Sequence, residues 1–219
     1  MLAERSQQTD RRKTNMKTVT GLFDTYDQAS EAVRALKAAG IPNEDISMVA
    51  SNAEGRYKVD DTEGAAEGAG TGAGIGAAVG GAGGLLTGLG LMAIPGVGPV
   101  VAAGWLAATA AGAAAGAVAG GAVGGIIGAL TDSGVPEEDA HVYAEGVRRG
   151  GTLVTARVAD SDTAEAEAIL KRSNWVDLEE RRSSYREQGW NRFDETLDPY
   201  SPAQIEEERT RYASRGTLI

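Results

Sequence analysis

His141 is the single histidine of the chain, and it stands one helical turn after Glu137 and Glu138. An imidazole beside carboxylates is typical of a metal site or of general acid–base catalysis. Acids in the first turn of a helix are equally typical of a solvated face that favours the helix dipole, and we expect this second arrangement. Since the chain has no cysteine and no second histidine, we predict no catalytic, metal-binding or cofactor-binding residue.

The segment 72–77 has the sequence GAGIGA, which matches part of a nucleotide-binding pattern. A dinucleotide fingerprint needs a strand directly before it and an acidic residue about 20 positions later. Here a polar linker precedes the glycines, and the next acid is Asp132. The chain also lacks the Gly-Lys-Ser or Gly-Lys-Thr of a P-loop. We therefore predict that the protein is not an enzyme.

The charge of the chain restricts its partners. A formal net charge of −10 argues against nucleic acid, because a phosphate backbone needs a basic face. Residues 1–17 are polar and charged without an apolar core, which predicts a flexible leader and not a secretory signal.

The charged residues are absent from one long stretch. Residues 68–131 form a run of 64 positions without Asp, Glu, Lys, Arg or His, and they hold 21 of the 31 glycines. Spacing by four puts residues on nearly one face of a helix, and small residues at this spacing allow close helix packing. We therefore predict a glycine-zipper helical hairpin over residues 61–132. Its first ladder is Gly64, Gly68, Gly72, Gly76, Gly80, Gly84 and Gly88. Its second ladder begins at Gly104 and continues, after Ala108, with Gly112, Gly116, Gly120, Gly124 and Gly128.

A solvated hairpin of this composition would be unstable. Each glycine in an exposed helix costs about 1 kcal/mol relative to alanine, so the total of roughly 20 kcal/mol exceeds the stability of a typical domain. The hairpin must therefore pack with copies of itself, enter lipid, or do both, because lipid enforces helical hydrogen bonding. We expect self-association and a bilayer as the partners.

Large apolar residues gather around the expected turn at residues 94–99 and predict the membrane-entering tip. They are Leu89, Leu91, Met92, Ile94, Val97, Val100, Val101 and Trp105. The hairpin could span the bilayer, wedge into one leaflet or pack only with itself. The protein would then lie on the cytoplasmic side of a membrane with the hairpin inserted, or form a soluble cytoplasmic oligomer.

The segments on either side of the hairpin predict one α+β domain. Residues 18–60 contain a strand, a helix with a Thr25–Gln28 capping box, and a second strand with its linker. Residues 133–182 contain two helices, a strand at 153–158 and a closing strand near 176–178. Two βαβ units with helices on one face of the sheet are the ferredoxin-like arrangement, here split by the hairpin.

The two halves match at an offset of 134 residues. The matched pairs are Glu31 with Glu165, Ala32 with Ala166, Leu36 with Leu170, Lys37 with Lys171 and Gly40 with Asn174. This match indicates a repeat, and the alternative is two unrelated α/β pieces.

Residues 183–219 form an acidic tail with aromatic side chains, including Trp190, Phe193 and Tyr200. Ser201 and Gln204 form a capping box that predicts a helix over 202–213. The aromatic residues either anchor a partner or latch the tail onto its own domain or a neighbouring subunit. We favour the latch, since a self-docking tail needs no further partner.

The sequence resembles a known family. Residues 21–24, 29–36, 40–41 and 46–49 resemble the opening of the bacterial general stress (heat-induced stress, YflT-like) domain, and the glycine-rich insert and residues 189–211 are similar to parts of its relatives. The resemblance implies a stress-associated protein without a catalytic residue. We thus expect a non-enzymatic structural or interaction protein. The alternative is a soluble regulatory module that binds a small ligand and is multimerised by the hairpin.

Overall fold

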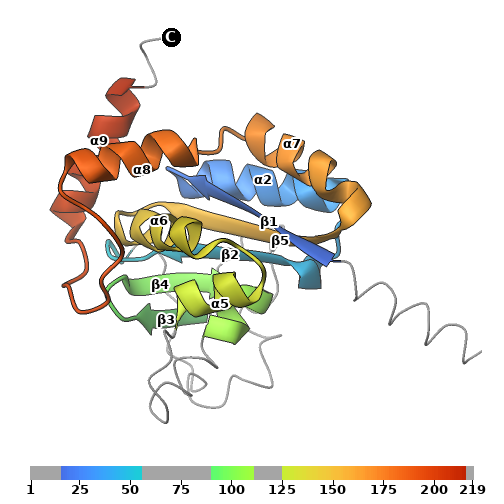
Figure 1. Cartoon of the computed structure of the whole chain (residues 1–219), viewed down its shortest axis with the longest axis horizontal. Coiled ribbons are helices and arrows are strands. Elements are labelled where there is room, and N and C mark those ends of the chain that lie inside the picture. The colour runs from blue at the N-terminus through green and yellow to red at the C-terminus, as the bar shows by residue number, and fades with distance from the viewer. Residues whose placement is uncertain (1–15, 56–89, 111–124, 216–219) are drawn as a thin grey trace, which may run out of the picture.

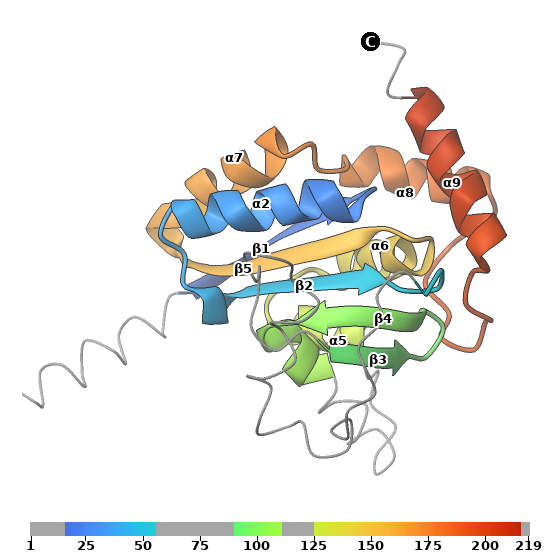
Figure 2. The same cartoon turned by 180° about the vertical axis from the view of Figure 1, so that it is seen from behind.

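The computed structural model describes residues 16–55, 90–110 and 125–215. A five-stranded antiparallel sheet has the order β1-β5-β2-β4-β3, and helices cover both of its faces (Figures 1 and 2). The predicted α+β class is confirmed. The strands are β1 (Met16–Phe23), β2 (Ile46–Ser51), β3 (Gly90–Ile94), β4 (Gly98–Ala103) and β5 (Thr152–Ala159). The helices are α2 (Tyr26–Ala38), α5 (Ile126–Asp132), α6 (Glu137–Arg148), α7 (Thr163–Arg172), α8 (Leu178–Glu187) and α9 (Pro202–Arg215), with short 3-10 turns at Asn43–Asp45 and Asp160–Asp162.

Helix α2 forms where the sequence predicts it. The Thr25 hydroxyl accepts a hydrogen bond from the backbone N–H of Gln28 at 3.3 Å, and the Gln28 side chain accepts one from the Thr25 N–H at 3.2 Å. This capping box satisfies two of the free donors at the helix start. The apolar stripe of the helix is fully buried against the sheet: Ala29, Ala32, Val33 and Leu36.

The residues that match at the offset of 134 lie on α2 and α7. Both helices follow strands that pair along their whole length, β1 with β5, and both pack on the same face of the sheet. Gly40 and Asn174 follow the two helices with positive φ angles of 88° and 62°. A left-handed residue is a common helix stop, and asparagine is the best non-glycine residue for it. The sequence match therefore corresponds to equivalent structural positions.

The opposite face of the sheet is also covered, by α5 and α6. Leu22 packs in the cluster on that side, whereas its neighbour Phe23 packs in the cluster under α2 and α7. Successive side chains of a strand point to opposite faces, so both faces of β1 are apolar and buried. The prediction of helices on one face only was wrong.

The glycine-rich insert turns within the expected residues 94–99, but the prediction of helices on either side of this turn was wrong for residues 90–103. Residues 90–103 form the β3–β4 hairpin, and β4 pairs with β2 from Met48 opposite Ala103 to Ser51 opposite Val100. The backbone of β4 forms its hydrogen bonds with β2. The segment therefore does not need the internal hydrogen bonds of a helix. Helical residues begin only at Trp105, whose indole N–H donates to the Asp45 carbonyl at 3.2 Å.

The expected membrane tip is therefore part of the sheet. Ile94, Val97, Val100 and Val101 are buried in the core, while Leu91 is 43% exposed on the edge strand. The backbone of Met92 pairs with Val100. Leu89 lies outside the described residues, as do the predicted ladder residues Gly64, Gly68, Gly72, Gly76, Gly80, Gly84, Gly88, Gly112, Gly116, Gly120 and Gly124.

One ladder residue, Gly128, lies in the short helix α5 and is half-buried. Within the ranges that the structure describes, no helix is long and apolar enough to cross a membrane.

The expected closing strand near residue 176 does not form. The N–H of Val176 donates one hydrogen bond to the Leu22 carbonyl at 2.8 Å, beside β1. Asp177 then caps helix α8, because its side chain accepts from the N–H of Glu180 at 2.9 Å. This cap and the acids that follow it start a helix, so the chain leaves the sheet after a single contact.

Gly104 and Gly40 share a φ of 88° and so provide a matched pair. A Cβ at Gly104 would lie 2.2 Å from the Ile46 carbonyl oxygen, whereas nothing lies within 4 Å of a Cβ at Gly40. We expect Gly40→Ala to lower the free energy of unfolding by about 1 kcal/mol through backbone strain alone. Gly104→Ala should cost about 3 kcal/mol or more, because it adds a clash with β2. Urea unfolding measures both, and equal costs would contradict this description of the corner after β4.

Candidate functional site around helix α6

Helix α6 lies between the sheet and the C-terminal part of the chain (Figure 1). Pro136 precedes its first turn, which holds Glu137, Glu138 and Asp139, and basic residues stand at its end. This order of charges complements the helix dipole. Every residue from 141 to 150 is buried, because the sheet covers one side of the helix and the tail covers the other.

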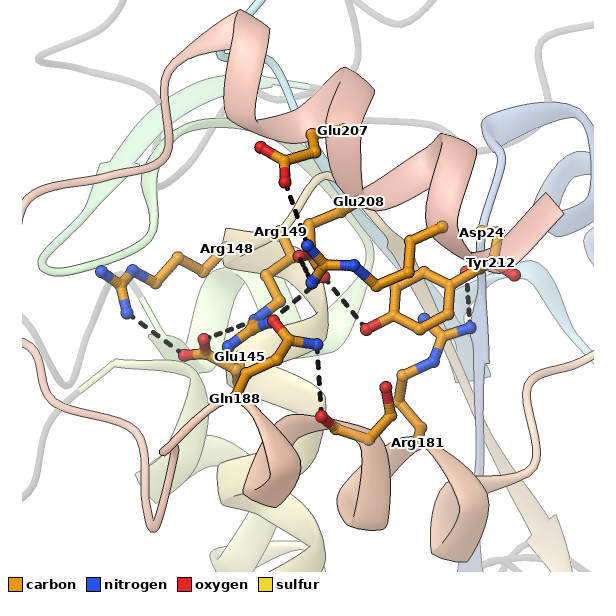
Figure 3. A network of polar contacts seen from close by, with 11 residues as sticks. Asp24, Glu145, Arg148, Arg149, Arg181, Gln188, Glu207, Glu208 and Tyr212 are labelled. Atoms are coloured by element: carbon orange, nitrogen blue, oxygen red, sulfur yellow. Dashed lines mark hydrogen bonds and ion pairs between the residues drawn. The ribbon is translucent and has the colours of Figure 1, made fainter. Parts of the chain in front are cut away.

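Glu145 is the centre of a buried charge network (Figure 3). Its residue is 0% exposed, and its two carboxylate oxygens accept from Arg149 Nε at 2.7 Å and from Arg148 Nη1 at 3.3 Å. A buried carboxylate is costly unless it is paired and hydrogen-bonded. The spacings of three and four residues along one helix provide both partners.

Arg149 continues the network to the tail. Its Nη1 donates to Gln188 at 2.6 Å and to Glu208 at 3.1 Å, and its guanidinium lies 4.2 Å from the ring centre of Tyr185. Burial opposes the positive charge, but the attraction of Glu145 outweighs it and raises the pKa of Arg149. The side chain therefore stays charged and serves as a fixed cation, not as a proton donor.

Glu208 of α9 accepts from three groups. Besides Arg149 these are Arg211 Nη1 at 2.5 Å and the Tyr212 hydroxyl at 3.0 Å. The guanidinium of Arg181 stacks 3.6 Å from the Tyr212 ring centre and donates to Asp24 at 2.8 Å. Helices α8 and α9 are thus tied to α6 and to the loop after β1 (Figure 3).

The tail residues singled out from the sequence make contacts within the chain. Trp190 meets Tyr185 edge-on with ring centres 5.6 Å apart. Phe193 is 7% exposed and packs in the core cluster of α5 and α6. Tyr200 lies under the guanidinium of Arg148, 4.9 Å from its ring centre. These are the contacts that the latch onto the protein's own domain predicts.

The segment between α8 and α9 also crosses the turn of the β3–β4 hairpin. A Cβ at Gly96 would lie 2.6 Å from the Cα of Glu195, so only glycine permits this approach. Further along, Arg209 of α9 pairs with Glu54 at 2.9 Å. The tail therefore holds the hairpin turn and the loop after β2 in place.

Sequence reasoning missed the centre of this network. It did not connect Arg148 and Arg149 with Glu145. The spacings of three and four residues within one helix were the available signal. The tail partner Glu208 carries no such signal, because it is brought to Arg149 only by folding.

A small pocket lies at the other end of α6, between its first turn, helix α8 and residues 190–192, with a volume of about 330 Å³. His141 lines it and is 8% exposed, so the expectation of a solvated histidine was wrong. Its Nε2 lies 3.3 Å from Arg192 Nη2 and 3.6 Å from Glu137 Oε1. Burial, and then the charge of Arg192, lower the pKa of His141, so the imidazole is neutral at pH 7.

A larger groove of about 1430 Å³ lies at the end of the sheet near the two 3-10 turns. Most residues of its lining are apolar, and its charged residues are mainly acidic, with Glu44, Asp160 and Asp162 among them. Asp45 in its wall is paired with Arg157 at 2.7 Å. In the described ranges no group of three or more His, Asp or Glu side chains could hold a metal ion.

Fold and site together define an α+β protein whose C-terminal helix α9 is held by Arg149, a buried residue at the end of α6, through Glu208. We call this contact the clasp. Comparison of the chain with protein-family models, curated proteins and solved structures found no match.

The network predicts unequal roles for two glutamates. Glu145→Gln should lower the free energy of unfolding by about 3 kcal/mol, since it leaves two buried arginines short of a countercharge. Glu207→Gln is the matched control, because this side chain is 72% exposed and, among the described residues, pairs only with Arg211; its cost should stay below about 1 kcal/mol. Urea unfolding of both variants checks this, and a small effect at Glu145 would show that the clasp is dispensable.

His141 should make stability depend on pH. Its folded pKa lies below the unfolded value of about 6.5, so the unfolded state takes up the proton first. The free energy of unfolding that neutral His141 contributes is fully present above the unfolded pKa. It is lost as the pH falls from that pKa through the lower pKa of the folded state. Between pH 7.5 and 5.5 the wild type should lose stability more steeply than His141→Gln. Carboxylate effects are common to both proteins, so parallel curves in urea unfolding would rule out a buried neutral imidazole.

Proposed function

We propose that this protein is a non-enzymatic, stress-associated interaction protein that self-associates through its glycine-rich segments. The observation that carries the proposal is that residues 68–89 and 111–124, which lie outside the described structure, contain no charged residue and hold 15 glycines. A solvated chain of that composition gains little from its own packing, whereas close packing against a second copy uses the bare backbone. The resemblance to the general stress domain supports the association with stress.

Self-association is a better proposal than membrane insertion as the primary role. Membrane insertion relied on the large apolar side chains around the expected tip. Val97, Val100 and Val101 are each at most 1% exposed in the folded core, so they would reach lipid only if the sheet opened. We therefore propose a cytoplasmic oligomer, with the cytoplasmic surface of a bilayer as the alternative partner.

We also propose that the core is a ferredoxin-like repeat that has been extended. Three features support this: the strand order β1-β5-β2, the pairing of β1 with β5, and the position of α2 and α7 on one face. The β3–β4 hairpin, α5 and α6 are then additions, and the contact of Val176 with Leu22 stands where a fourth strand would pair.

A second candidate function is a regulatory module that binds a small ligand. The specific observation in its favour is the pocket beside His141, which brings together arginine, histidine and tryptophan side chains. The two functions are compatible, because the pocket and the glycine-rich segments are different parts of the chain.

Substitution in the glycine ladder tests self-association. Gly116 and Gly120 lie outside the described residues, and replacing both with leucine would separate closely packed helices. We expect a smaller oligomer from Gly116→Leu/Gly120→Leu, measured by crosslinking and detergent-resolved sizing. Membrane partitioning in carbonate extraction should hold or rise, because leucine is more apolar.

The matched control for this test is Ala115→Leu/Ala119→Leu, which adds similar bulk at the same spacing one position off the ladder. This control should keep the wild-type oligomer. If the ladder variant also keeps it, the glycines do not form the contact between copies and the proposal fails.

A further inference from the structure

The pocket at the start of α6 has an unusual set of polar atoms. His141 Nδ1, Arg182 Nε and Trp190 Nε1 are all buried, and none has a hydrogen-bond partner in the part of the chain that the structure describes. All three residues line the same pocket. Buried polar atoms are nearly always hydrogen-bonded in folded proteins, so three on one small pocket indicate a bound group.

All three atoms need a hydrogen-bond acceptor as their partner. The indole and guanidinium nitrogens can only donate hydrogen bonds. Arg192 Nη2, which can only donate, lies 3.3 Å from His141 Nε2. The neutral tautomer that accepts from Arg192 carries its proton on Nδ1, which is then a donor too. A ligand that satisfies them must carry acceptor atoms.

Two of the three arginines at the pocket have a positive charge that no described carboxylate pairs with. Arg182 is already held by Glu179 at 2.6 Å and by Asp139. In contrast, Arg186 and Arg192 line the pocket and form no ion pair with any described residue. The planar guanidinium fork matches a carboxylate or a phosphate.

The acidic residues of the pocket indicate which of these two anions, carboxylate or phosphate, binds better. Glu137 and Glu138 also line the pocket, and their two negative charges balance those of Arg186 and Arg192. In a site without net charge neither anion is attracted overall, so the desolvation cost decides. This cost rises with the square of the charge and is far larger for a dianionic phosphate than for a singly charged, planar carboxylate. Trp190 adds an aromatic surface for the apolar part of such a molecule.

We propose that this pocket binds a small-molecule carboxylate, with Arg186 and Arg192 holding the carboxylate group. The volume of about 330 Å³ suits a molecule of metabolite size. This inference rests on the second function proposed above and is independent of self-association. A failed ligand titration on a protein that still oligomerises would remove the ligand site and leave the oligomer proposal intact.

The test is a titration of the full-length, ¹⁵N-labelled protein with sodium acetate, at ionic strength held constant with sodium chloride. The indole N–H resonance of Trp190, assigned with Trp190→Phe, reports on the pocket. We expect a saturable shift of this resonance, while those of Trp105 and Trp175 stay in place. Inorganic phosphate, titrated in the same way, should bind at least tenfold more weakly.

The variant Arg186→Ala/Arg192→Ala should weaken acetate binding at least tenfold. Both side chains are exposed, so folding should be retained, and circular dichroism with a urea midpoint verifies this. Arg172→Ala, an exposed arginine at the end of α7, is the matched control and should bind acetate as the wild type does. No saturable shift, equal affinity in the double variant, or tighter binding of phosphate would each overturn the proposal.

Discussion

The carboxylate of Glu145, buried between Arg148 and Arg149, is the interaction on which the C-terminal half of the structure depends. Burying a charge costs free energy that only paired partners offset. The helix supplies these partners at spacings of three and four residues, and the second carboxylate, Glu208, comes from α9. The tail is therefore needed to complete the charge balance of the core, and the ring of Tyr185 shields the pairs from water.

This constraint connects parts of the chain that are far apart. Because α9 closes over Arg149, the segment before it must cross the β3–β4 turn at Gly96, where no side chain fits. The hairpin is thus held by β2 on one side and by the tail at its turn. The apolar residues that a membrane tip would need are consequently occupied in the core. This is the physical reason to favour association of the glycine-rich segments with each other over insertion of the hairpin into lipid.

Helix α6 connects the tail contacts with the candidate ligand pocket. Its last turn carries the clasp for the tail, and its first turn carries the pocket beside His141. The same tail supplies Trp190 and Arg192 to the pocket. A ligand held by Arg192 would therefore contact the segment that leads to α9. Occupancy of the pocket and docking of the tail would therefore involve the same residues.

Local signals in the sequence determined the elements whose stabilising contacts are near in the chain. The Thr25–Gln28 capping box, the helix stops at Gly40 and Asn174, and the helix that begins at Pro202 could all be predicted, because each depends on groups within a few residues. The repeat at an offset of 134 residues and the α+β class followed from these elements.

Tertiary structure alone decided the rest. The sequence predicts residues 90–103 as the tip of a glycine-rich helical hairpin. They form strands instead, because the edge of β2 supplies backbone hydrogen bonds to β4. His141 read as a solvated residue, but Arg192, 51 positions later, helps to bury it. In both cases the deciding partner is distant in sequence, so no local propensity or spacing could reveal it. The sequence determined which residues are able to pair, and the tertiary structure determined which of them are in contact.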